Sequence, residues 1–216
     1  MMAVDQRIDV LGPGDTPAIL DVFCDAFADY PVMRYVLGPG GHTQPRLRQL
    51  IGYFVLRRVR LGGPLFGARA ADGTLAGVAT MTVPIESVAP PDLLAARDRV
   101  FDALGQDCRA RHEAYAEAAR LFDTIGPHHH LNMLGVRHAW HGKGVGRLLL
   151  TAVADLANAD PRSNGVSLTT ETAENVKLYE HCGYNVVGEA RVADSFQTWG
   201  LFRSRGPLCP PRDRRE

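Results

Sequence analysis

The stretch that decides the fold runs from Val136 to Arg147 and reads VRHAWHGKGVGR. An apolar run from His130 to Val136 precedes it and predicts a strand. An aliphatic run at helical spacing follows and predicts a helix from about residue 145 to residue 158. Three glycines, Gly142, Gly144 and Gly146, lie in the turn between the two. Because the first N–H groups of a helix have no partner within the helix, this turn predicts a site for a phosphate or pyrophosphate.

Two familiar phosphate motifs do not fit this glycine cluster. A dinucleotide-binding fingerprint that starts at Gly142 needs glycine at position 147, where the chain has Arg147. A Walker A loop needs Ser or Thr directly after Lys143, where the chain has Gly144. The alternative to a phosphate site is a glycine-rich turn that binds no ligand.

A second stretch, from Glu171 to Tyr184, reads ETAENVKLYEHCGY and follows the next predicted strand. Asn175 and Tyr179 are four residues apart, so they share one face of a short helix. The pair Gly183 and Tyr184 fits the start of another strand.

In order and spacing, the two stretches resemble the GNAT superfamily of N-acetyltransferases over about residues 128 to 192. The loop resembles the family's acetyl-CoA pyrophosphate loop, with His141 in the position of Gln or Arg and with Gly144 and Gly146 after it. His141 departs from the family pattern, and so does Arg137-His138, where many relatives have Asp-Pro. The entry of the strand at Pro127-His128 loosely resembles the puromycin-acetyltransferase-like branch.

This resemblance implies acetyl-CoA as cosubstrate and a primary amine of a small molecule or a protein as acceptor. The cluster His128, His129 and His130 leaves a metal site open as an alternative, but no metal is expected because no carboxylate or Cys partner is suggested nearby. The resemblance also implies that the pantetheine arm pairs with the strand before the loop and lies beside Asn175. The implied cofactor-binding set is Leu134, Gly135, Val136, His141, Gly142, Lys143, Gly144, Val145, Gly146, Arg147 and Asn175.

The transfer of an acetyl group to an amine needs a neutral amine, donors for the oxyanion and a proton for the leaving thiolate. The resemblance and a phenol pKa of about 10 make Tyr179 the candidate proton donor. Glu171, at the carboxyl end of a strand, and His130 are the candidate bases. The alternatives are a packing tyrosine, an exposed Glu that caps a helix and strand histidines without a catalytic role. Cys182 is interpreted as a packing thiol, because family members transfer the acetyl group directly.

The predicted elements follow the order β, two helices, ββ, helix, β, helix, β, helix, ββ, which indicates an α/β fold. The hairpin is predicted from Leu65–Ala70, the turn Asp72-Gly73 and residues 75–83. The helical segment over residues 90–125 has a candidate break at Gly105. We expect a single-domain GNAT fold over residues 1–205, with a mixed twisted central sheet flanked by helices on both faces, and a flexible C-terminal tail over residues 206–216.

Composition narrows the class of protein further. The chain has 216 residues, with 24 basic and 24 acidic side chains and a formal net charge of zero. This balance argues against a nucleic-acid binder and against a polybasic membrane anchor. Four scattered cysteines indicate neither a metal site nor a disulfide framework. Without a signal peptide or a long apolar run, we expect a soluble cytoplasmic protein, monomeric or homodimeric.

Three functions remain open at this point. The first is an acetyl-CoA-dependent N-acetyltransferase that transfers the acetyl group directly to a primary amine. The second is a non-catalytic module that binds or senses acyl-CoA. The third, a protein that binds ATP or NAD, is the weakest because the chain lacks the residues that both nucleotide motifs require.

Overall fold

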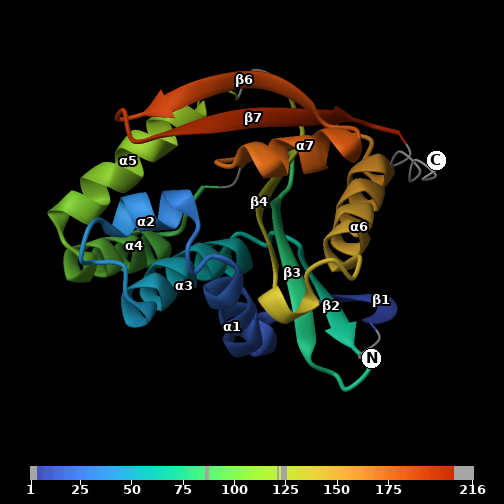
Figure 1. Cartoon of the computed structure of the whole chain (residues 1–216), viewed down its shortest axis with the longest axis horizontal. Coiled ribbons are helices and arrows are strands. Elements are labelled where there is room, and N and C mark those ends of the chain that lie inside the picture. Colours follow the sequence, from blue (N-terminus) through green and yellow to red (C-terminus); the bar gives the residue numbers. More distant parts are fainter. Residues whose placement is uncertain (1–3, 86–87, 121, 123–125, 207–216) are drawn as a thin grey trace.

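The computed structural model describes residues 4–85, 88–120, 122 and 126–206 (Figure 1). These residues form one seven-stranded mixed sheet with helices on both of its faces. The strands are β1 (Val4–Val10), β2 (Leu65–Ala70), β3 (Leu75–Thr82), β4 (His129–Val136), β5 (Gly165–Thr170), β6 (Asn185–Val192) and β7 (Phe196–Ser204).

The described ranges contain seven α-helices. They are α1 (Thr16–Ala26), α2 (Pro31–Leu37), α3 (Gln44–Arg60), α4 (Pro91–Leu104), α5 (Gln106–Arg120), α6 (Val145–Ala159) and α7 (Ala173–His181). Short 3-10 turns cover Pro13–Asp15 and His138–Trp140. Within the described ranges, no helix combines the length and the apolar character that crossing a membrane requires.

The sheet has the strand order β1-β2-β3-β4-β5-β7-β6. Every neighbouring pair is antiparallel except β4 and β5, which run parallel. Both strands of this pair therefore point their carboxyl ends in the same direction, where ligands of α/β proteins bind.

Two apolar clusters pack against opposite faces of the sheet. One holds α1 to α5, with Ile19, Val22 and Phe23 fully buried, and the other holds α6 with Leu149 and Val153. Glycines allow the close packing of helices on strands: a Cβ on Gly135 would lie 2.8 Å from a ring carbon of Phe23, and one on Gly77 would lie 2.7 Å from Val145. This packing fixes α1 and α6 on either side of β3 and β4.

The structure confirms the predicted fold class and most predicted elements. The hairpin of β2 and β3 turns at Gly73, whose φ of +82° suits glycine. The helical segment divides at Gly105 into α4 and α5, and residues 121 and 123–125 lie outside the described part. The short helix α2 was missed, because the Pro31 that ends α1 in the sequence pattern also serves as the first residue of a new helix. Residues 207–216, most of the expected tail, lie outside the described residues.

Candidate active site

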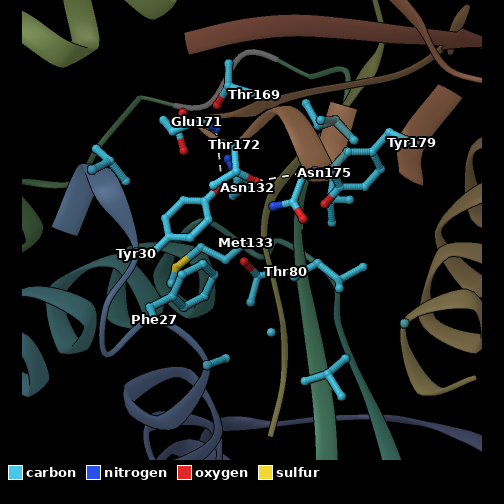
Figure 2. A pocket seen from close by; sticks show the side chains of 18 of the residues that line it. Phe27, Tyr30, Thr80, Asn132, Met133, Thr169, Glu171, Thr172, Asn175 and Tyr179 are labelled. Carbon is cyan, nitrogen blue, oxygen red and sulfur yellow. Dashed lines mark hydrogen bonds between the residues drawn. The ribbon is translucent and has the colours of Figure 1, made fainter. Parts of the chain in front are cut away.

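A cavity of about 1340 Å³ opens between α1, α3 and α5 on one side and β4, α6 and α7 on the other. Figure 2 shows its central part: Phe27 and Tyr30 enter from the helical side, Asn175 and Tyr179 from α7, and Glu171 lies across from Tyr30. The cavity brings together all the predicted site residues except Lys143.

The cavity exists because β4 and β5 separate. The two strands pair only over His129–Leu131 of β4 and Val166–Leu168 of β5. Beyond Leu131, β4 still pairs with β3 up to Val136, so only its edge toward β5 is left without a strand partner. Such an edge offers backbone N–H and C=O groups to an extended ligand, in the way an added strand would be bound.

The glycine loop forms the amino-terminal end of α6. Gly142 and Gly144 have φ values of +72° and +81°, which favour glycine. The first N–H bonded within the helix is that of Leu148, to the carbonyl of Gly144 at 3.0 Å. The N–H groups of the three residues between them therefore have no acceptor within the helix.

Gly146 is different, because neither its conformation nor its packing requires glycine. A Cβ there would meet only Val136, at 3.8 Å, so alanine would fit. Glycine makes a helix less stable than alanine does, by about 0.5–1 kcal/mol, so the helix itself does not favour glycine at this position. Gly146 lines the cavity, and so do Gly144, Val145 and Arg147 at the amino-terminal end of α6, a kind of helix end that commonly binds anions. These features fit the pyrophosphate of acetyl-CoA.

Two histidines that depart from the family pattern hold the loop in place. The ring Nε2 of His141 lies 3.0 Å from the carbonyl oxygen of Val136. The backbone N–H of His138 donates to Oδ2 of Asp25 in α1 at 2.7 Å, and its ring Nδ1 lies 3.2 Å from the same oxygen. The departures therefore keep the loop attached to β4 and α1.

The two cations of the loop differ in position. Arg147 lines the cavity. Lys143 does not, because its Nζ donates to the carbonyl of Ala139 at 2.8 Å and lies 4.6 Å from the centre of the Trp140 ring. Lys143 is therefore the one member of the implied cofactor-binding set that the structure does not bring into the cavity among the described residues.

Helix α7 presents Asn175 and Tyr179 to the cavity from successive turns (Figure 2). Thr172 caps the helix by accepting from the N–H of Asn175 at 3.3 Å. Burial, reinforced by the charge of Glu171, raises the pKa of Tyr179 above its ordinary value. The Tyr179 phenol is therefore protonated at neutral pH, as a proton donor must be.

Glu171 is a buried carboxylate, with 7% of its surface exposed. Its Oε1 accepts hydrogen bonds from the hydroxyls of Tyr115 and Thr198, both at 2.9 Å, and its N–H donates to the Tyr30 hydroxyl at 3.2 Å. Burial raises its pKa, against hydrogen bonds from Thr198, Tyr115 and Tyr30 that lower it. The alternative of an exposed helix cap is therefore wrong.

His130 lines the same cavity, with its ring Nδ1 2.7 Å from the Ser167 hydroxyl. Burial, with smaller contributions from His128, Arg58 and Arg57, lowers its pKa to about 4. His130 is therefore neutral at pH 7 and a weak base there.

Three residues around the site were missed at the level of sequence: Tyr115, Thr198 and Arg58. Tyr115 and Thr198 reach Glu171 from 56 and 27 residues away along the chain, and no local pattern marks them. Arg58 did have a signal. It extends the apolar stripe of α3 at Phe54 and Val55 by one turn, so its side chain falls on the buried face.

Comparison with known families identifies the domain. Residues 103–186 match the family model of the acetyltransferase (GNAT) domain. This segment holds the whole arrangement of β4, the glycine loop, α6, β5, Glu171 and α7. Over this segment the chain is similar to GNAT acetyltransferases, and this similarity implies acetyl-CoA as cosubstrate.

Solved structures share the fold along nearly the whole chain. A structure described as histone acetyltransferase HPA2 and related acetyltransferase from Corynebacterium glutamicum is 22% identical, with a TM-score of 0.65 over 97% of this chain and 99% of that chain. Arylalkylamine N-acetyltransferase 2 from Aedes aegypti is 16% identical, with a TM-score of 0.62 over 93% and 99%. The ribosomal-protein-S18-alanine N-acetyltransferase from Escherichia coli is 15% identical, with a TM-score of 0.54 over 97% and 98%. At these identities the likeness concerns the fold alone.

Proposed function

We propose that this protein is a GNAT N-acetyltransferase that transfers the acetyl group of acetyl-CoA directly to a primary amine. The observation that carries the proposal is the position of Glu171, a buried carboxylate in the cavity that also contains the glycine loop. The loop and Arg147 would bind the pyrophosphate, and the free edge of β4 at Leu134, Gly135 and Val136 would bind the pantetheine arm, beside Asn175. Acetyl-CoA supplies an activated acetyl thioester.

Glu171 would accept the proton of the acceptor amine, directly or through water. An amine attacks only as the neutral base, and a carboxylate with a raised pKa is a better proton acceptor near neutral pH. The hydrogen bonds from Tyr115 and Thr198 hold Oε1 in place. A backbone N–H of Leu134 or Val136 would polarise the thioester carbonyl.

Tyr179 would donate its proton to the sulfur that leaves. Cys182 also lines the cavity, but burial raises the pKa of its thiol and so disfavours the thiolate that a nucleophile needs. This supports direct transfer, in which the acetyl group never resides on the protein.

We further propose that residues 1–205 act as one N-acetyltransferase domain, since helices α1 to α5 complete the wall of the cavity opposite β4 and α7. Membership of the puromycin-acetyltransferase-like branch stays a prediction that rests on Pro127-His128 and on the spacing of the motifs.

The test is thiol release from acetyl-CoA against a panel of small amines and peptides, with mass spectrometry of the products. We expect an N-acetylated product and no acetylated protein during turnover. Tight acetyl-CoA binding without turnover on any acceptor would favour a sensing module instead. A stable acetyl adduct on Cys182 would contradict direct transfer.

A further inference from the structure

The described residues that line the cavity carry an excess of positive charge. Among the described lining residues, Glu171 is the sole acidic side chain. Arginines line the cavity from three elements: Arg57 and Arg58 of α3, Arg120 of α5 and Arg147 of α6. Arg147 belongs to the glycine loop, whereas Arg58 contacts β4 at Asn132, four residues before the end of the strand at Val136. Of these four arginines, Arg58 is therefore the one whose hydrogen bond to Asn132 places it beside β4.

Arg58 is a buried charge without a counter-charge. Only 4% of its surface is exposed, and no carboxylate of the described residues lies within ion-pair distance. Its Nη1 donates to Oγ1 of Thr82 and, at 3.2 Å, to Oδ1 of Asn132. Its Nε and Nη2 donate to no acceptor of the described chain. A buried guanidinium is costly unless it is paired, so an open pair of donors calls for an anion.

Asn132 adds a further donor at the same place. Its Oδ1 accepts from Arg58 and, at 3.0 Å, from Thr82. This assignment directs the amide oxygen toward the two donors, which leaves the Nδ2 hydrogens to face another group. Asn132 is also the extra residue of a β-bulge, since β4 pairs Leu131 with Met81 but Met133 with Thr80. Bulges of this kind redirect a side chain beside active sites.

The arrangement also has a suitable distance from the proposed base. The last paired residues of the two strands are Leu131 of β4 and Leu168 of β5. Asn132 follows Leu131 by one residue, and Glu171 follows Leu168 by three. Two residues of strand correspond to about 7 Å along the strands, and the separation of β4 from β5 beyond Leu131 adds to this distance. We therefore expect an elongated small molecule to place an amine at Glu171 and an anionic group at Arg58.

We propose that the acceptor is a primary amine that also bears a carboxylate or phosphate, and that Arg58 selects it through Nε and Nη2 with Asn132 beside it. This assignment rests on the proposed acetyl transfer for its chemical step. The planar guanidinium suits two parallel hydrogen bonds to either anion. Burial lowers the pKa of Arg58 to about 10, so the side chain stays cationic at neutral pH.

The test uses amines in matched pairs that differ only in the anion. The carboxylate arm compares β-alanine and longer ω-amino acids with their amides, and the phosphate arm compares O-phosphoethanolamine with ethanolamine. We expect kcat/KM to be about tenfold higher, or more, for the anionic member of at least one arm. Arg58→Gln should remove that preference through KM. Arg58→Lys keeps the positive charge but not the planar pair of N–H donors, so it should retain part of the preference for the anionic amine.

Arg60→Gln is the matched control, because Arg60 belongs to the same helix, pairs with Asp92 and does not line the cavity. It should retain the full preference. Circular dichroism and thermal melting establish that each variant is folded. If Arg58→Gln does not fold, Arg58→Lys and Asn132→Ala are compared with the wild type instead, by the same ratio of kcat/KM for anionic and neutral amines.

Binding separates this inference from the proposed function. Titration of each amine into the protein saturated with CoA measures the acceptor site without turnover. Tighter binding of the anionic members that depends on Arg58 supports the inference even if no amine is acetylated, in which case only the proposed function fails. Equal binding of both members, or acetylation of both at equal kcat/KM in wild type and Arg58→Gln, overturns the inference and leaves acetyl transfer intact.

Discussion

The hydroxyl of Tyr115 donates a 2.9 Å hydrogen bond to Oε1 of Glu171, which joins helix α5 to the residue that follows β5. Because this bond stabilises the carboxylate, it lowers the pKa of Glu171 against the effect of burial. Tyr115→Phe should therefore raise that pKa and move the acid limb of the kcat/KM profile to higher pH, by about half a unit to one unit. A pH series of initial rates measures the shift.

Tyr35→Phe is the control for this variant. Both tyrosines pack against Phe196, but Tyr35 does not line the cavity. Its profile should match that of the wild type. A profile of Tyr115→Phe that does not move, or that moves to lower pH, would contradict the assignment of Glu171 as the base.

The choice between the two candidate bases can be made by substitution. Glu171→Gln keeps the shape and an oxygen that can accept from Tyr115 and Thr198, but it cannot take a proton. We expect kcat to fall roughly 100- to 10,000-fold, with acetyl-CoA affinity unchanged. His130→Asn should have little effect, since the pKa of His130 is about 4. The opposite ranking of the two variants would make His130 the base.

Tyr179 and Tyr184 offer a second matched pair, because their rings pack at 5.6 Å on the same side of the sheet. Tyr179→Phe should reduce kcat roughly 100-fold and leave acetyl-CoA affinity unchanged. Tyr184→Phe removes a buried hydroxyl that has no hydrogen-bond partner in the described structure, so it should be neutral or stabilising. Equal activity of the two variants would make Tyr179 a packing residue.

Two helical glycines separate stability from binding. A Cβ has room both at Gly146 of α6 and at Gly52 of α3, and only Gly146 lines the cavity. Both Gly→Ala variants should raise the free energy of unfolding, by about 0.5–1 kcal/mol. Only Gly146→Ala should weaken acetyl-CoA binding. Chemical denaturation and calorimetric titration of the two variants test this, and a loss of stability in Gly146→Ala would show that the space beside it is not free.

Short sequence patterns were enough to predict which residues on the cofactor side of the cavity lie together. The glycines of the loop and the pair Asn175 and Tyr179 belong to single turns, so their spacing along the chain fixes their spacing in space. The same holds for Glu171, which sequence placed at the carboxyl end of a strand.

The residues around the proposed acceptor site were harder to predict, because their contacts join segments that lie far apart in the sequence. Tyr115 reaches Glu171 only when α5 folds over the ends of β6 and β7, and nothing in the helical pattern of residues 106–120 specifies that position. The loss of Lys143 from the site has a local cause that spacing does not reveal, namely the attraction of its ammonium to the Trp140 ring and the Ala139 carbonyl. Arg58 could have been found as a charge on the apolar stripe of α3.

The central claim is that acetyl-CoA binds with its phosphates at the amino-terminal end of α6. The most direct measurement is the acetyl-CoA dissociation constant of Gly146→Glu, since a Cβ at this position meets only Val136, at 3.8 Å, and the new carboxylate would face the phosphates. We expect the dissociation constant to rise roughly tenfold or more while the protein stays folded. An unchanged dissociation constant in a folded Gly146→Glu variant would contradict it.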